Sequence, residues 1–131
     1  MHKSAAWPLA VLYVGLVVYA SWYPFLDWRD QGVAPWEFLF APVPRYWTGF
    51  DVGINIVGYM PLGALVTLGA LRNRRTRHPV LWTVLGASLL SLCMESVQSY
   101  VPTRVPSRED WLLNSLGAAL GSVATLLLEK V

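Results

Sequence analysis

The sequence is poor in charge, in cysteine and in histidine. Charged residues make up 14% of 131 positions, against roughly 25% in soluble domains. The single cysteine, Cys93, excludes a disulfide within the chain, and His2 and His78 are the two histidines. Hydrophobic residues, by contrast, reach 55%, and the mean hydropathy is +0.44. This composition indicates an integral membrane protein.

Four apolar segments each come close to the roughly 20 residues that a bilayer core requires. They cover about 5–26, 50–71, 79–100 and 110–129. No internal repeat, low-complexity tract or second domain interrupts them. The sequence therefore predicts an all-α fold, a transmembrane four-helix bundle that forms a single domain over residues 1–131.

The densest cationic cluster, residues 72–78, connects the second and third apolar segments. Short basic connections between membrane spans stay in the cytoplasm. We therefore expect both chain termini to be cytoplasmic and the 27–49 and 101–109 connections to lie outside. A short arginine-rich loop between two spans is a topology signal, so we expect no nucleic-acid partner.

The 27–49 connection is too apolar for a free loop and too often broken by proline for a membrane span. It contains the run Trp36-Glu37-Phe38-Leu39-Phe40, with prolines on both sides. Tryptophan and tyrosine also gather on this predicted outer side, as they do at headgroup level. We expect the connection to lie in the outer membrane interface, as a lid or a shallow re-entrant segment.

Polar side chains recur at helical spacing in three of the apolar segments. Residues three or four positions apart share one face of a helix. The three polar faces consist of Asp51, Asn55 and Tyr59; of Ser88, Ser91, Glu95 and Gln98; and of Asp110 and Asn114. Polar groups within lipid-spanning segments are costly unless they face one another. We therefore expect the three faces to converge.

The convergence is expected near the outer membrane surface. Glu95 lies about five residues, or roughly 7 to 8 Å, below the outer end of its segment. Asp51 and Asp110 lie near the outer ends of theirs. Arg104 and Arg108, on the turn above, are the natural cations for these three acids. The sequence thus predicts a polar ligand-binding site without a metal ion or cofactor, because the spacing matches no metal motif.

Small residues and one proline indicate where helices pack. Gly58 and Gly63 flank Pro61, which removes a backbone donor and should kink the second segment. Gly117 and Gly121 form a Gly-x-x-x-Gly pattern, which lets two membrane helices approach closely. We expect these five residues to serve helix packing.

Four separated motifs, in order, resemble the VanZ-like family of small membrane proteins. They are Asn55-Ile-Val-Gly-Tyr-Met-Pro61-Leu-Gly63, Glu95-Ser-Val-Gln98, Arg104, and Asp110-Trp-Leu-Leu-Asn114-Ser-Leu-Gly117-Ala-Ala-Leu-Gly121. The resemblance is strongest over residues 45–121. It implies a multi-pass protein of the bacterial cytoplasmic membrane, in a family whose namesake is linked to teicoplanin (glycopeptide) resistance. It implies no settled catalytic mechanism.

Three classes of function stay open at this point. The first is binding of a lipid headgroup or lipid-linked cell-envelope precursor, since arginine binds phosphate and carboxylates and amides bind sugar hydroxyls. The second is an enzyme acting on a lipid-linked phosphate or glycolipid, although no serine or cysteine has a plausible base beside it. The third is a subunit of a lipid carrier, which would require a homo-oligomer because four helices are too few. The structural alternative for Gln98 and Asn114 is interhelical hydrogen bonding.

Overall fold

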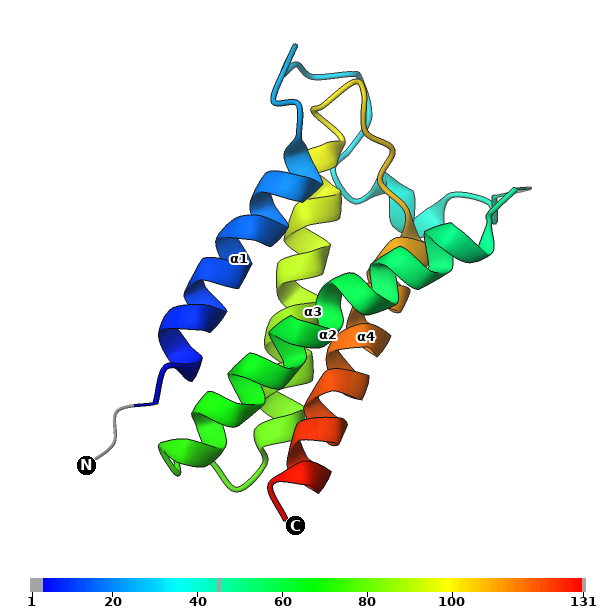
Figure 1. The fold of residues 1–131 in the computed structure, drawn as a ribbon. Coiled ribbons are helices and arrows are strands. Elements are labelled where there is room, and N and C mark those ends of the chain that lie inside the picture. Colours follow the sequence, from blue (N-terminus) through cyan, green and yellow to red (C-terminus); the bar gives the residue numbers. More distant parts are fainter. Residues whose placement is uncertain (1–3, 45, 131) are drawn as a thin grey trace.

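The computed structural model describes residues 4–44 and 46–130, and this part of the chain is helical, without strands. Its elements are α1 (Ala6–Trp22), the short 3-10 helix η1 (Glu37–Phe40), α2 (Gly49–Arg72), α3 (Pro79–Gln98) and α4 (Arg108–Leu128). Figure 1 shows the four α-helices side by side as one bundle. The predicted all-α four-helix architecture is confirmed.

Three of the helices, α2, α3 and α4, are long and apolar enough to cross a membrane. The first helix is shorter than the sequence predicts: α1 has 17 residues and ends at Trp22 instead of near position 26. The cause is local, because Pro24 disfavours helical backbone at the preceding Tyr23, which adopts φ −57 and ψ 135. This early end decides where Arg104 binds, because its guanidinium donates to carbonyls of the last turn of α1.

The bundle has two different ends. The loop end carries the 23–48 connection with η1, together with the 99–107 turn (Figure 1). The basic end carries the 73–78 turn, the start of α1 and the end of α4. Helices α2 and α4 run from the loop end to the basic end, and α1 and α3 run in the opposite direction.

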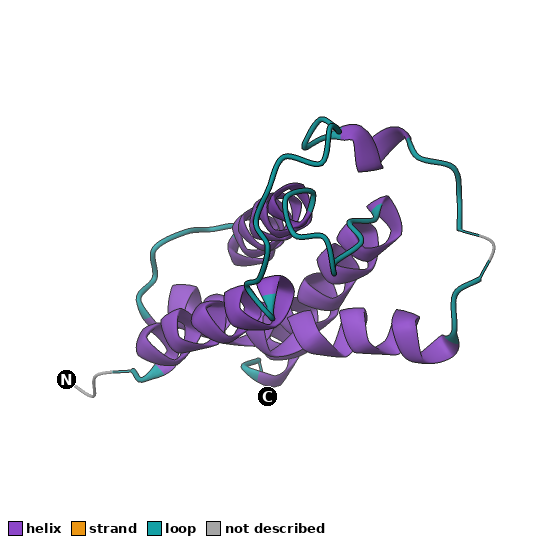
Figure 2. Ribbon diagram, turned by 90° about the horizontal axis from the view of Figure 1, so that it is seen from above, coloured by secondary structure: helices purple, strands orange, loops and turns teal. Residues whose placement is uncertain are grey.

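The 23–48 connection lies across the loop end, as seen from above in Figure 2. The backbone amide of Arg29 donates a 3.0 Å hydrogen bond to the carbonyl of Tyr100, just beyond α3. The guanidinium of Arg108 donates a 3.0 Å hydrogen bond to the carbonyl of Leu39 in η1. The connection therefore covers the end of α3 and the start of α4, and its position in the membrane interface stays a prediction.

Helices α2 and α4 are in direct backbone contact. Three glycines lie so close to the opposite helix that an added Cβ would overlap its backbone: Gly63 against Ala118, Gly117 against Ile56, and Gly121 against Met60. Helix α2 is continuous through Pro61. The two helices are therefore too close together for any side chain to fit at the three glycine positions.

Gly58 does not take part in this contact, contrary to the expectation from sequence. A Cβ at Gly58 would meet nothing within 4 Å. Five residues separate it from Gly63, which places the two glycines on different faces of α2. The Gly58 carbonyl instead accepts a hydrogen bond from the hydroxyl of Tyr13 in α1.

The glycine contact predicts a clear contrast between two matched substitutions. Gly63→Ala should destabilise the folded protein by about 1–3 kcal/mol, because the extra methyl group forces α2 away from α4. Gly58→Ala should leave stability unchanged or raise it slightly, since alanine favours helix and the space is open. Thermal unfolding in detergent measures both; equal losses would contradict the assigned contact.

The orientation of the bundle stays a prediction that labelling can test. With Cys93 replaced by alanine, a cysteine at position 105 should react with a membrane-impermeant reagent on intact cells, because Val105 is 82% exposed at the loop end. A cysteine at position 76, in the 73–78 turn, should react only after permeabilisation, because the arginines around it hold this turn in the cytoplasm. The reverse pattern would invert the topology.

Candidate functional site

Eight of the nine side chains predicted to form a site line two adjoining cavities at the loop end. The mouth cavity, about 450 Å³, includes Asp51 and Glu109 in its wall. The inner cavity, about 400 Å³, lies deeper between α1 and α2 and includes Tyr59, Glu95 and Asn114. The cavities share the lining residues Ile54, Asn55, Gln98, Arg104 and Asp110, so they lie next to each other.

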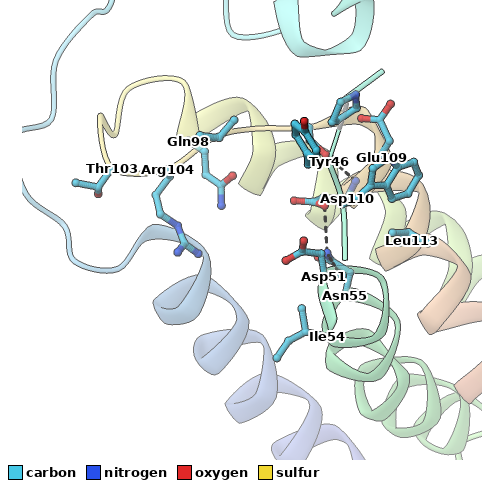
Figure 3. A pocket seen from close by; sticks show the side chains of 14 residues that line it. Tyr46, Asp51, Ile54, Asn55, Gln98, Thr103, Arg104, Glu109, Asp110 and Leu113 are labelled. Atoms are coloured by element: carbon cyan, nitrogen blue, oxygen red, sulfur yellow. Dashed lines mark hydrogen bonds between the residues drawn. The ribbon is translucent and has the colours of Figure 1, made fainter. Parts of the chain in front are cut away.

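The mouth is built by the first turns of α2 and α4. Thr48 and Asp51 cap α2 reciprocally: the Asp51 amide donates to Thr48 Oγ1 at 3.1 Å, and the Thr48 amide donates to Asp51 Oδ2 at 3.0 Å. Asn55 Nδ2 donates to the Asp51 carbonyl at 2.8 Å. It also donates to Asp110 Oδ1 at 3.1 Å, as drawn in Figure 3. The Asn55–Asp110 bond joins the two helices across the site.

Glu95 connects α3 to the start of α4. Its side chain is buried, and Glu95 Oε2 accepts a 2.8 Å hydrogen bond from the backbone amide of Ser107. Ser107 is the N-cap of α4, and its hydroxyl accepts a 2.9 Å hydrogen bond from the Asp110 amide. Sequence reasoning missed Ser107, although a serine three residues before an acid is a typical helix start.

Arg104 binds the end of α1 and not the acids. Its Nε donates to the Ser21 carbonyl at 3.0 Å, and its Nη2 donates to the Ala20 carbonyl at 2.6 Å. Gln98 Nε2 donates to the same Ser21 carbonyl at 2.7 Å. Figure 3 shows Arg104 across the cavity from Asp51. The last carbonyls of a helix lack intrahelical donors and form the negative end of its dipole, so they attract a guanidinium.

The expected pairing of Arg104 and Arg108 with Asp51, Glu95 and Asp110 is therefore wrong. The ion pairs found within residues 4–44 and 46–130 are Arg72–Glu129 and Arg108–Glu109. Arg108 lines neither cavity, because its guanidinium is bound to Glu109 and η1. The early end of α1, which Pro24 signals in the sequence but which the prediction overlooked, provides the carbonyls that bind Arg104.

Two polar atoms beside the inner cavity have no partner. Asn114 Nδ2 donates to Ser91 Oγ at 2.9 Å, but Asn114 Oδ1 accepts no hydrogen bond within the described part of the chain. The hydroxyl of Tyr59 is likewise buried without a partner there. Both residues are almost fully buried, at 5% and 6% exposed. Such groups are usually satisfied by protein or ordered water, and both residues contribute to the lining of the inner cavity.

The cavity lining is acidic. Four carboxylates and one guanidinium line the two cavities, counting the residues that the structure describes: Asp51, Glu95, Glu109, Asp110 and Arg104. Amide and hydroxyl groups add neutral donors and acceptors. Such a lining suits a ligand with hydroxyl or amino groups, and it disfavours one with several negative charges.

Arg104 should stabilise the packing of α1 at the loop end. Arg104→Ala should lower the free energy of unfolding by about 1–3 kcal/mol, because it leaves two helix-end carbonyls without their charged donor. Arg104→Lys should recover only part of this, since lysine lacks the planar fork that reaches both carbonyls. Thermal unfolding in detergent tests this, with Arg29→Ala, in the 23–48 connection at the same end of the bundle, as the control expected to change little.

Comparisons with known proteins identify the family of this chain. The VanZ/LLP1 family matches residues 8–129, which extends the similarity to α1. Human lipase maturation factor 2 is 38% identical over 69 residues, which are 50% of this chain but 10% of that protein's length. No solved structure matches the chain. Since the family match covers nearly every residue and three helices can cross a membrane, this chain is a multi-pass membrane protein that belongs to the VanZ/LLP1 family.

Proposed function

We propose that the loop-end cavity binds the headgroup of a membrane lipid, with a lipid-linked cell-envelope precursor as the preferred ligand. The observation that carries this proposal is that the polar mouth cavity adjoins the inner cavity between α1 and α2, with five lining residues in common. The volumes, about 450 and 400 Å³, fall in the roughly 300–1,000 Å³ range of small-molecule sites.

The apolar walls support a lipid rather than a soluble ligand. Leu16 of α1 and Ile54 of α2 line the inner cavity, and they are 56% and 55% exposed on the bundle surface. In a membrane this surface faces hydrocarbon. A hydrocarbon chain can therefore lie between α1 and α2 while its headgroup contacts the polar lining.

The polar lining suits a headgroup rich in hydroxyl or amino groups. Asp51 and Asp110 can accept hydrogen bonds from hydroxyls at the mouth. Arg104 uses two of its five N–H donors on α1, which leaves donors for one anionic group. The acidic balance of the lining makes a sugar-bearing or amino headgroup with a single phosphate a better fit than a polyphosphate.

The floor of the inner cavity supports the same ligand. The Tyr59 hydroxyl can donate and Asn114 Oδ1 can accept, and both are unpartnered. An unpaired buried polar group costs about 1–3 kcal/mol. A ligand hydroxyl placed between these groups would recover part of that cost, which would add to its affinity.

Binding fits the site better than group transfer. The hydroxyl of Ser107 caps α4, and His78 lies at the basic end, so neither forms a nucleophile with a base. We further propose the bacterial cytoplasmic membrane as the location. Resistance to teicoplanin-type glycopeptides is the phenotype that capture of an envelope precursor would affect.

Two substitutions test the site. Tyr59→Phe should leave thermal stability unchanged or slightly raised, because it deletes an unpartnered group, yet weaken ligand binding roughly 5- to 10-fold through one lost hydrogen bond. Glu95→Gln should fold, since the glutamine oxygen can still accept the Ser107 amide, and should also weaken binding. The measurement is titration of the detergent-solubilised protein with a fluorescent polyprenyl-phosphate sugar.

Tyr19→Phe is the matched control, because Tyr19 is 57% exposed on α1 and lines neither cavity. It should change neither stability nor binding. Wild-type affinity in both Tyr59→Phe and Glu95→Gln would sink the proposed site and leave these residues as interhelical contacts.

A further inference from the structure

A third cavity, of about 510 Å³, lies at the basic end, on the opposite side of the bundle from the loop-end site. It is bounded by the start of α1, the end of α2 and the start of α3. Trp7, Val66, Ala70, Arg75, Trp82 and Thr83 are among its lining residues. We propose that this cavity binds the phosphate of an anionic phospholipid, with Arg75 as the main contact.

Arg75 is placed to bind an anion. Its guanidinium carbon lies 6.0 Å from the centre of the Trp7 ring, and no acidic side chain pairs with it within the described ranges. This distance is at the outer limit of a cation–π contact, so the Trp7 ring leaves the guanidinium free to make a planar, two-point contact with phosphate oxygens.

The charge around the cavity favours the same ligand. The cations at the basic end, in the part of the chain with described structure, are Arg72, Arg74, Arg75, Arg77 and Lys130. The acid found among them is Glu129, and Arg72 neutralises it at 3.2 Å. The excess of positive charge would attract a phosphate and disfavour a cationic or strongly hydrogen-bonding neutral headgroup.

The other cavity walls identify the phosphate as that of a lipid. Val66 and Ala70 provide an apolar surface, and Trp82 is 61% exposed at the rim. Exposed tryptophan at the end of a membrane helix lies at headgroup level, next to the acyl chains. A soluble phosphate would gain nothing from these walls. The Trp7 indole N–H is also buried without an acceptor, and a headgroup oxygen could supply one.

This inference does not depend on the loop-end proposal. The basic-end cavity shares no lining residue with the two loop-end cavities, and the charge of its lining is opposite to theirs. The test is titration of the purified full chain with short-chain phosphatidylglycerol and with phosphatidylcholine, followed by native mass spectrometry. Wild type should bind phosphatidylglycerol more tightly by about tenfold, and Arg75→Ala should lose most of that difference.

Arg77→Ala is the matched control, since it removes the same charge from the same turn but does not line the cavity. Arg77→Ala should retain most of the preference for phosphatidylglycerol over phosphatidylcholine. Glu95→Gln, which changes the loop-end cavity, should retain all of this preference. Arg75→Lys should recover only part of the binding. An equal loss of this preference in Arg75→Ala and Arg77→Ala would overturn the site, because it would indicate non-specific attraction to the positive charge of the basic end. Equal binding of both lipids by the wild type would overturn it as well. Full displacement of the lipid by millimolar glycerol phosphate would overturn the lipid as ligand.

Discussion

The backbone contact between α2 and α4 determines the geometry of the loop-end site. Because Gly63, Gly117 and Gly121 admit no side chain, the two helices lie close enough for Asn55 to bond Asp110 across their interface. The first turns of both helices then form the mouth of the cavity. Helix α3 is held to this pair through Glu95 and the N-cap of α4, which completes the polar wall.

The sequence predicted the parts of this site that depend on helical periodicity. The polar faces of α2, α3 and α4 do meet at one end, because three- and four-residue spacing reports directly which residues share a face. It could not predict the partners of Arg104, since these depend on where α1 ends and on three-dimensional contacts with its carbonyls. Gly58 shows the same limit: its position beside Pro61 suggested close packing, but an added Cβ there would meet nothing within 4 Å.

The two ends of the bundle present opposite charge to the two membrane surfaces. The acidic cavity lies at the loop end, and the cavity lined by Arg75 lies at the basic end. This polarity follows from one requirement, which is that charges avoid the hydrocarbon core and collect at the helix ends. Under the two proposals, one chain would bind different headgroups at separate sites.

The dependence of the site on α4 has a consequence for biosynthesis. The Thr48–Asp51 cap is local, so the start of α2 can acquire its final form as soon as that helix exists. Asp110 and Asn114, however, belong to the last helix of the bundle to leave the ribosome. Until α4 has entered the membrane and docked on α2, the earlier helices have neither their glycine contact nor a closed cavity. The loop-end cavity would therefore become able to hold a ligand only once α4 has inserted, whereas no residue of α4 lines the basic-end cavity.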